Sequence, residues 1–480
     1  LAADFARSNG VVPLGHNAEV AEVAAVNPFK IELVAELGFL LGRPVQLVVA
    51  DPGQIQSLLL RHYGGVPERA ERPNDAQGIQ QDELVLSETD LAKLAGQPPI
   101  IRFVNVVLAQ AIRDRASDIH FEPFEQEFRI RCRIDGMLHD APPPPRALAL
   151  PVVSRLKVLA NLNIAERRLP QDGRMRMTVA DSAVDLRVST LPTQFGESVV
   201  LRVLDRGAVR LEMKQLGLPA AMQTSLTAAI HRPHGLVVVT GPTGSGKTTT
   251  LYSCLQVLNT PEAKLLTVED PVEYEIDGIM QVPVNPAAGL TFPRALRSFL
   301  RQDPDIVMVG EIRDEETARI AIQSSLTGHL VLSTLHTSDA ASVVTRLVDM
   351  GIEPFLLAST LEAVLAQRLL RRICTACRTT YAPSDAVLRQ LNWSRDDWGG
   401  ASCHRGSGCA ECQHTGYRGR IGIFEYLSMS ESLRDLITRG ASLEEIRREA
   451  LRGGMVLLRD ASIAAIQTGQ TTVEEVLKAT

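Results

Sequence analysis

The chain has 480 residues, of which 45% are hydrophobic and 22% charged, a composition that excludes a largely disordered or collagen-like chain. Its length suggests roughly three domains, at about 150 residues per domain. The formal net charge of -6 and an aromatic content of 4% argue against a dedicated nucleic-acid binder, which usually carries a basic excess and stacking aromatic residues.

Hydropathy gives no sign of a membrane-spanning segment. The most hydrophobic early stretch, residues 31–50, is interrupted by Glu32 and Arg43, whereas a span needs ~18 uninterrupted apolar residues. The first residues lack the basic-then-apolar order of a signal peptide. The chain begins with Leu1 rather than Met, so we expect that residues before it are missing.

The first 97 residues are expected to form a small domain and a linker. Residues 1–65 combine a helical pattern at 27–38 with a short apolar strand at 45–50. Residues 66–97 are polar and contain several prolines and glycines, which is typical of an extended or partly flexible linker.

Residues 98–205 are predicted to form a compact α+β domain. Pro98 and Pro99 open a helix whose apolar residues recur at helical spacing, and the alternating segment after 127 predicts a strand pair. In chain order we expect a helix at 98–115, two strands joined by an Asp135-Gly136 turn, a helix at 152–162, and two strands that end near residue 203 with a turn at 171–173.

From residue 235 the chain alternates between strands and helices. The strands are short and continuously apolar, as a sheet covered by helices on both faces requires. We expect strands at 236–240, 265–269, 306–309 and 330–334 and helices at 248–259 and 315–326. This pattern predicts an α/β nucleotide-binding core, which is followed by a cysteine-rich segment at 374–412 and a helical tail at 433–480.

The segment 241–248 carries the strongest motif. It has the sequence G-P-T-G-S-G-K-T, fits G-x-x-x-x-G-K-[ST], follows an apolar strand and opens a helix. Backbone N–H groups of such a loop and the helix N-terminus favour phosphate, so Lys247 would reach the β- and γ-phosphates and the Thr248 hydroxyl would ligate Mg²⁺. The expected nucleotide-binding residues are Gly241, Pro242, Thr243, Gly244, Ser245, Gly246, Lys247, Thr248 and Thr249.

Two acidic residues follow strands that should end at one edge of the sheet. Glu311 comes just after the strand 306–309, at the edge where α/β folds bind ligands, and could hold Mg²⁺ directly or through water. The alternative is an acid that caps the following helix. Glu269 could orient or deprotonate the attacking water. Because two acids beside one metal and one triphosphate shift each other's pKa values, the assignment of general base and metal ligand stays open.

Two histidines, His329 and His336, flank the strand 330–335. A histidine beside a γ-phosphate can donate a hydrogen bond to it and so report its presence. Either residue alone could equally be a surface or core histidine. Their place in the nucleotide-binding core makes them candidates, and we include His329 in the catalytic set.

The seven cysteines include two close pairs, Cys374-x-x-Cys377 and Cys409-x-x-Cys412. In an intracellular chain this pattern indicates metal binding rather than disulfides. Two such pairs supply the four thiolates of a tetrahedral zinc site, and because no ligand position is left open we expect a structural site. Three further residues of the segment are expected to be bystanders: Cys403, His404 and His414.

Hydrolysis of a triphosphate also needs positive charge that responds to the charge developing on the γ-phosphate. The domain 98–205 supplies Arg174, Arg187 and Arg202 as catalytic candidates. These arginines lie on short predicted strands and could swing toward a nucleotide bound elsewhere. An arginine finger contributes ~10³–10⁵ in rate.

These motifs together resemble those of the secretion ATPases of bacterial type II secretion and type IV pilus systems, most closely the type II branch. The resemblance covers nearly the whole chain. In family terms the acidic and histidine segments are the Asp box around Glu269, the Walker B segment ending at Glu311 and the His box at His329 and His336. The most specific stretches are R-A-S-D-I-H-F-E-P (115–123), L-P-Q-D-G-R (169–174), D-L-R-V-S-T-L-P-T (185–193), T-V-E-D-P-V-E-Y (267–274), L-R-Q-D-P-D-I-V-M-V-G-E-I-R-D (300–314) and L-T-G-H-L-V-L-S-T-L-H-T (326–337).

The resemblance implies a RecA-like P-loop ATPase core that binds ATP and Mg²⁺ and is preceded by a PAS-like α+β domain. It divides the chain into a partner-docking domain at 1–65, a linker at 66–97, the PAS-like domain at 98–205, the ATPase domain at 206–370, a zinc tetracysteine subdomain at 371–415 and a helical C-terminal region at 416–480. ATP would lie between the two larger domains, so that hydrolysis changes the angle between them.

The resemblance also implies partners and a location. The chain would work as a homo-hexamer that pushes an inner-membrane platform protein, assembles a pseudopilus and drives folded proteins across the outer membrane. Its N-terminal domain would dock to the cytoplasmic domain of an inner-membrane partner. The protein would thus be cytoplasmic and peripheral to the inner membrane, with only indirect membrane contact and no nucleic-acid partner.

Three alternatives compete with this interpretation. A type IV pilus assembly ATPase has the same chemistry, but the short first unit and the start L-A-A-D-F-A-R-S-N-G-V-V favour the secretion branch. A RecA-like nucleic-acid translocase would need a basic channel, which the net charge does not encourage. A nucleotide-binding scaffold without turnover is opposed by the presence of the loop together with Glu269 and Glu311. Apart from these three, the tetracysteine argues against the pilus-retraction branch, which is similar in its core but lacks this insert.

Overall fold

The computed structural model divides the chain into two compact units, Leu1–Leu84 and Val85–Thr480. The described residues are 6, 11–16, 20–25, 37, 41, 44–50, 54–55, 58–59, 62 and 95–479 without 180–181, 206–211, 392, 394–397 and 399–400. Of the helices formed by these residues, none combines the length and the apolar character needed to cross a membrane.

The first unit contains a three-stranded sheet. β1 (Val11–His16) pairs antiparallel with β2 (Ala21–Ala25), which pairs parallel with β3 (Val45–Val49). Buried residues alternate between the two faces of the sheet, so each face has its own small apolar core. β3 confirms the strand predicted at 45–50. The helix predicted at 27–38 lies outside the described residues except for Leu37, and most of the predicted linker lies outside them as well.

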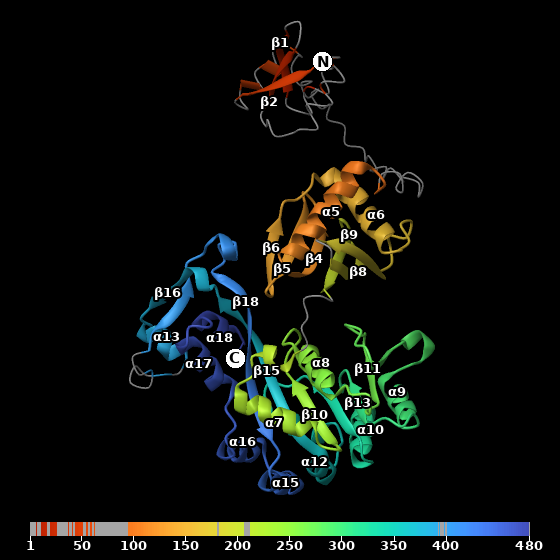
Figure 1. Ribbon diagram of the computed structural model, residues 1–480, viewed down its shortest axis with the longest axis vertical. Helices are drawn as coiled ribbons and strands as arrows, with labels where there is room; N and C mark the ends of the chain where they lie inside the picture. The colour runs from red at the N-terminus through yellow and green to blue at the C-terminus, as the bar shows by residue number, and fades with distance from the viewer. Residues whose placement is uncertain are drawn as a thin grey trace, which may run out of the picture. The chain divides into compact units, whose positions relative to one another are not determined.

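Residues 98–205 form an antiparallel sheet in the order β6-β5-β4-β9-β8-β7, and α5 and α6 pack on each other and on it (Figure 1). The prolines at the first turn of α5 start the helix, and its buried residues recur every three or four positions. The elements are α5 (Pro98–Arg113), β4 (Ala116–Pro123), β5 (Phe128–Ile134), β6 (Met137–Ala141), α6 (Ala149–Leu159), β7 (Gln171–Val179), β8 (Ser182–Thr193) and β9 (Gly196–Asp205).

The turn predicted at 171–173 is wrong. These residues begin β7, which pairs with β8 from Gln171↔Thr190 onward, so three strands rather than two complete this sheet. A Cβ at Gly173 would lie 2.6 Å from the carbonyl oxygen of Ala160. The glycine therefore permits close backbone approach within a strand, although its polar neighbours imitate the composition of a turn.

The rest of the second unit is built on a seven-stranded sheet in the order β12-β11-β13-β14-β10-β15-β18, in which only β18 runs antiparallel to its neighbour. The four strands predicted between 236 and 334 are confirmed. The strands are β10 (Gly235–Thr240), β11 (Leu265–Glu269), β12 (Met280–Pro283), β13 (Ile306–Val309), β14 (Leu330–Leu335), β15 (Leu361–Ile373) and β18 (Tyr417–Ser428).

Helices cover both faces of this sheet (Figure 1). Along β10 the side chains alternate: Val237 and Val239 pack with α7 and α8, whereas Leu236 and Val238 join the core of the other face. This arrangement confirms the predicted α/β class. The helices are α7 (Ala220–Ile230) and α8 (Lys247–Leu258) on one face and α9 (Phe292–Phe299), α10 (Glu315–Leu326), α11 (Ser342–Asp349) and α12 (Pro354–Thr360) on the other.

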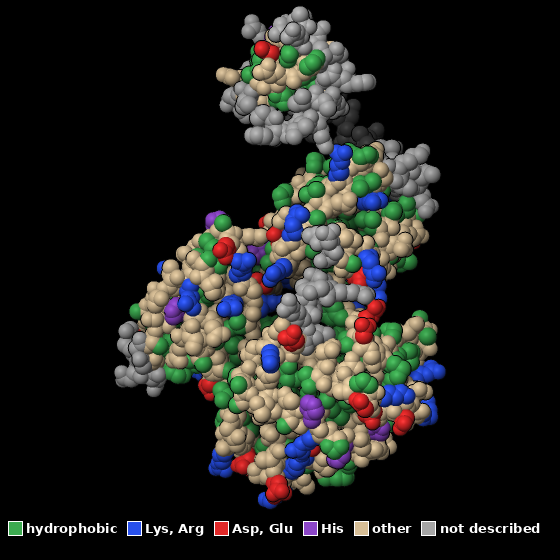
Figure 2. Space-filling view, in the orientation of Figure 1, with side chains coloured by type: hydrophobic (Ala, Val, Ile, Leu, Met, Phe, Trp, Pro, Cys, Tyr) green, Lys and Arg blue, Asp and Glu red, His purple; other side chains and the backbone are tan. Residues whose placement is uncertain are grey.

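The cysteine-rich segment and the helical tail are joined to the same sheet. β18 pairs with β15 along most of its length, so residues far along the chain supply the edge strand. The segment between the cysteine pairs contains β16 (Arg378–Tyr381), α13 (Asp385–Gln390) and β17 (Cys403–Gly406), and the tail contains α15 (Glu431–Thr438), α16 (Leu443–Arg452), α17 (Leu458–Gln467) and α18 (Val473–Ala479). On the face that Figure 2 presents, acidic and basic side chains of the second unit lie interspersed.

Candidate active site and metal centre

The phosphate-binding motif forms a loop between β10 and α8. Gly241 has a φ of 148°, and a Cβ there would lie 2.5 Å from the carbonyl oxygen of Gln367, so only glycine fits. The loop curls around its own lysine: Nζ of Lys247 donates hydrogen bonds to the carbonyl oxygens of Gly241 (2.8 Å) and Pro242 (3.0 Å). The geometry thus presents an ammonium group at the N-terminus of α8.

The charge environment of Lys247 suits a phosphate ligand. Burial lowers its pKa, and Arg368 lowers it further, while Glu311 acts in the opposite direction. A phosphate beside the ammonium would offset this loss of hydration. The buried hydroxyl of Ser245 also has no hydrogen-bond partner among the described residues. The donors present therefore fit a polyphosphate.

The loop lines a cleft of ≈ 630 Å³. Acids at the carboxyl ends of β11 and β13 face it, as expected for parallel strands that end at one edge. The structure brings Lys247, Glu269 and Glu311 to this one cleft. Its polar and charged lining outside the loop includes Ser117, Arg202, Asp270, Glu273, Arg313, Thr334, His336 and Arg420, and the loop contributes Thr243, Gly244, Ser245, Gly246, Lys247, Thr248 and Thr249.

Glu311 lies in a cluster of charged side chains. Its carboxylate pairs with Arg313, and the second oxygen is 3.4 Å from Nε2 of His336. The alternative role as a helix cap falls to another residue, because the side chain of Asp314 accepts the hydrogen bond from the backbone N–H of Thr317 at the start of α10. Glu311 therefore does not cap this helix, and its role as a ligand of Mg²⁺ stays a prediction.

Glu269 is the last residue of β11 and is almost fully buried. It accepts hydrogen bonds from the hydroxyl groups of Tyr252 and Thr267 (2.6 Å for Thr267) and from Nε2 of Gln281 (3.1 Å). Burial raises the pKa of Tyr252, and the adjacent Glu269 raises it further, so the phenol remains a donor. These donors fix the orientation of the carboxylate, whose role as base or metal ligand stays a prediction.

His329 does not lie at this cleft, which corrects the expectation from its motif. His329 directly precedes β14, and its Nδ1 is 2.9 Å from the carbonyl oxygen of Ser324 in α10. Because β14 runs parallel to β10, with Gly235 opposite Leu330, the start of β14 and the phosphate loop lie at opposite edges. Six strand residues span roughly 20 Å. His336, at the other end of β14, is the histidine of this motif that lines the cleft.

The three candidate arginines occupy different positions. Arg202 lines the cleft, with Nε 3.1 Å from Asp118. Arg187 donates to the carbonyl oxygen of Val272 and pairs with Glu273 at 3.0 Å. Arg174 lies opposite Arg187 in the β7–β8 pair and lines with it a neighbouring cavity of ≈ 460 Å³. Their catalytic roles stay predictions.

Replacing Arg187 with alanine should lower turnover at least about ten-fold while leaving nucleotide affinity nearly unchanged, because an arginine finger acts mainly on the transition state. The measurement is steady-state phosphate release together with nucleotide titration. Arg129→Ala is the matched control, since Arg129 is a half-exposed arginine of the same sheet that pairs with Glu127. An unaltered rate in Arg187→Ala would remove this residue from the catalytic set.

Sequence reasoning missed the residues that support the loop from behind. Nε2 of Gln367 donates to the carbonyl oxygen of Ser245 (2.6 Å), and its Oε1 accepts from the hydroxyl of Thr250 (2.8 Å). Gln367 belongs to β15, more than a hundred residues later, so no local pattern signals this contact. The sequence could have indicated Arg313, because this residue is part of the same motif as Glu311 and pairs with it.

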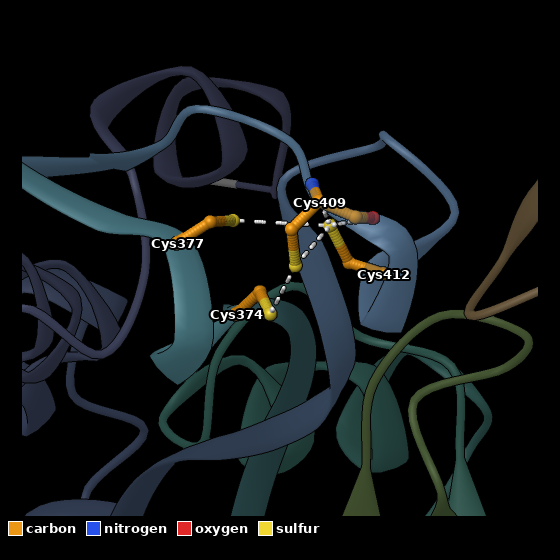
Figure 3. Close-up of side chains that lie close together, drawn as sticks. All are labelled: Cys374, Cys377, Cys409 and Cys412. Atoms are coloured by element: carbon orange, nitrogen blue, oxygen red, sulfur yellow. Dashed lines mark hydrogen bonds between the residues drawn. The ribbon is translucent and has the colours of Figure 1, made fainter.

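The two cysteine pairs converge on one point (Figure 3). Their Sγ atoms all lie within 4.8 Å of one another, with Cys374–Cys409, Cys377–Cys412 and Cys409–Cys412 separated by 3.9, 3.8 and 3.7 Å. Zn²⁺ with tetrahedral Zn–S bonds of ~2.3 Å requires S–S distances of about 3.8 Å. The four thiols therefore fit a structural zinc ion, which would cross-link the two chain segments. Among the described residues, the other candidates of this segment are not part of the group.

Backbone donors around Cys412 favour a thiolate. Burial acts to raise the pKa of Cys412, but the N–H groups of Cys409 and Gly416, both 3.2 Å from Sγ, together with the neighbouring thiols lower it to about 6. N–H donors to sulfur are the outer-shell contacts that orient zinc ligands.

Comparison with known proteins shows which family the chain is related to. The profile of the type II/IV secretion system protein family matches residues 93–478, and that of the MshEN domain matches residues 1–69. The chain is 45% identical to type II secretion system protein E of Dickeya dadantii over 482 residues, which cover 99% of this chain and 96% of the relative. It is 51% identical over 391 residues to type II secretion system protein E of Pseudomonas aeruginosa (82% and 77% covered). It is 44% identical over 482 residues to the type IV pilus assembly ATPase PilB of Myxococcus xanthus (99% and 85% covered).

Solved structures show the same fold. The ATPase DotB of Legionella pneumophila superposes with a TM-score of 0.59 at 22% identity, over 78% of this chain and 94% of DotB. The pilus retraction motor PilT with bound ADP superposes with a TM-score of 0.54 at 25% identity, over 78% of this chain and 96% of PilT.

Proposed function

Because the chain belongs to the type II/IV secretion system protein family, we propose that it is the ATP-hydrolysing motor of a type II secretion system. One observation carries the proposal: a single cleft joins the phosphate loop, two acids and an arginine of the 98–205 domain. The two relatives named for type II secretion are 45% and 51% identical to the chain, whereas PilB is 44% identical. The nucleotide is ATP, and the reaction is its hydrolysis to ADP and phosphate.

The residues of the cleft would have different roles in ATP hydrolysis. The loop and Lys247 bind the phosphates, and the oxygens of Thr248 and Glu311 would hold Mg²⁺, which neutralises charge on the phosphates when bound. Glu269 orients the attacking water. The water oxygen bonds to the γ-phosphorus, and the bond from the γ-phosphorus to the β–γ bridging oxygen breaks with its electron pair staying on ADP. The proton that the water loses passes to the Glu269 carboxylate or to an oxygen of the released phosphate. Arg202 already faces the cleft, whereas Arg187 must release Glu273 before it can act.

The position of the cleft between two domains suggests how hydrolysis could produce movement. Residues of the 98–205 domain and of the ATPase core both line it, so that hydrolysis would alter the contacts between them. The chain would act as a homo-hexamer that pushes an inner-membrane platform protein and assembles a pseudopilus. Residues 1–69, matched by the MshEN profile, would dock to the cytoplasmic domain of an inner-membrane partner. The motor would thus stay cytoplasmic, with indirect membrane contact.

The test is copurification of the full chain with the cytoplasmic domain of a secretion-platform partner, with phosphate release measured in parallel. We expect complex formation and a higher rate of hydrolysis. The second candidate is a type IV pilus assembly ATPase, which the near-complete match to PilB favours. Binding and stimulation by the corresponding pilus protein alone would establish that alternative instead.

A further inference from the structure

The segment 336–342, which follows β14, begins at the nucleotide cleft. His336 at its start is 3.4 Å from Glu311. The backbone N–H of Thr337 donates to the hydroxyl of Thr240 at 2.9 Å, and Thr240 is the residue that precedes the phosphate loop. The first part of the segment is therefore fixed to both sides of the cleft.

The second part of the segment is held by the C-terminal region. The Asp339 carboxylate accepts a hydrogen bond from the guanidinium of Arg447 in α16 at 3.1 Å. The buried carboxylate of Glu425 accepts from the backbone N–H of Ala340 (2.8 Å) with one oxygen and from that of Leu458, at the start of α17, with the other (3.0 Å). One carboxylate thus joins the segment to a helix of the tail.

A third contact links the segment, the loop and the last helix. Arg368 donates from Nη2 to the carbonyl oxygen of Ser338 (2.6 Å) and from Nε to that of Ala479 in α18 (3.3 Å). Its Nη1 would lie only 3.2 Å from a Cβ at Gly241, so the same guanidinium packs against the phosphate loop.

The Asp339–Arg447 pair is partly buried. The Asp339 side chain is 19% exposed and that of Arg447 31%. Burial acts to raise the pKa of Asp339, but hydrogen bonds from Ser342 and the charge of Arg447 lower it overall, so the carboxylate stays charged beside the guanidinium. In such surroundings a polar group that loses its partner is costly, so these hydrogen bonds fix the segment to its partners.

We propose that the segment 336–342 couples the nucleotide cleft to helices α16–α18, and that Arg447 is a positioning residue for hydrolysis. The proposal rests on the proposed function of the cleft. Arg447 holds Asp339, and the segment in turn holds His336 against Glu311. By linkage, nucleotide binding must then stabilise the packing of the tail by the same factor by which the packed tail favours binding of that nucleotide.

The test compares Arg447→Ala with Arg452→Ala in the full chain. Arg452 lies in the same helix, is largely exposed and pairs only with Glu449 among the described residues. For Arg447→Ala we expect kcat to fall about ten-fold, because His336 is no longer held against Glu311. We expect the affinity for ADP to fall by a factor within the range of site-to-site coupling, about five-fold or more. We also expect the protection from hydrogen exchange that ADP confers on 443–479 to disappear. Arg452→Ala should behave like the parent, and Arg447→Lys should recover part of the loss.

Two results would overturn the proposal: an unchanged kcat in Arg447→Ala, or ADP-induced protection of 443–479 that is equal in parent and variant or absent from the parent. If Arg447→Ala does not fold, Asp339→Asn is measured in the same way. This substitution removes the negative charge but keeps a side-chain oxygen that can accept the hydrogen bond from the backbone N–H of Ser342. A parent that shows the protection but no hydrolysis would refute the proposed function and leave the coupling intact.

Discussion

Lys247→Ala is expected to abolish ATP hydrolysis, with a fall of at least about a hundred-fold, the usual effect of removing one group that stabilises transition-state charge. Lys247 is the ammonium group around which the phosphate loop curls, and its hydrogen bonds to Gly241 and Pro242 would be exchanged for bonds to phosphate. Phosphate release at saturating ATP and Mg²⁺ measures the effect.

The matched control is Lys214→Ala, which removes an exposed lysine outside the cleft lining and should leave turnover unchanged. Thermal unfolding of both variants separates catalysis from folding, and both midpoints should stay near that of the parent. Turnover at the parental rate in Lys247→Ala would refute the assignment of the phosphate loop, and with it the motor function.

Cys374→Ser is expected to release zinc and to unfold the segment around the cysteine pairs. Structural zinc sites are worth roughly 10–16 kcal/mol in small peptides, far more than any other single contact of this segment. Cys374 follows directly on β15, and Cys412 precedes β18 by a few residues. Loss of the metal should therefore also loosen the outer ends of these two strands. Elemental analysis of the purified chain and limited proteolysis measure the two effects.

Cys403→Ser is the control for this variant. Cys403 is fully buried in the same segment, but it lies outside the group of four thiols. The Cys403→Ser variant should keep the full zinc content, even if the buried hydroxyl group of the new serine lowers the stability of the fold. Equal zinc content in Cys374→Ser and the parent would contradict the four-thiolate site.

The parts of the site that could be predicted are those made by neighbouring residues. The phosphate loop is one such part, because its strand, its glycines and its helix follow one another in the chain. The capping role of Asp314 and the pairing of Glu311 with Arg313 are local as well. The 171–173 segment shows the limit of local reasoning, because Gly173 serves a contact with Ala160 that composition does not reveal.

Histidines of one motif show the same limit more sharply. His329 and His336 are seven positions apart, and the sequence gives no reason to separate their roles. The direction of β14 in the sheet decides which of the two lines the cleft, since it places one residue at each edge. The support of the loop by Gln367 likewise depends on β15 lying next to β10.

The sequence by itself determined the α/β class, the phosphate loop and the two cysteine pairs, because each is recorded in the types and spacing of residues that are close in the chain. Tertiary structure alone decided the strand order, the position of His336 at the cleft, and the network that ties Asp339 and Glu425 to the tail. These features depend on pairing between strands and helices that are far apart in the chain. Such pairing depends on the burial of entire faces of the sheet and its helices, and the local periodicity of the sequence does not indicate it.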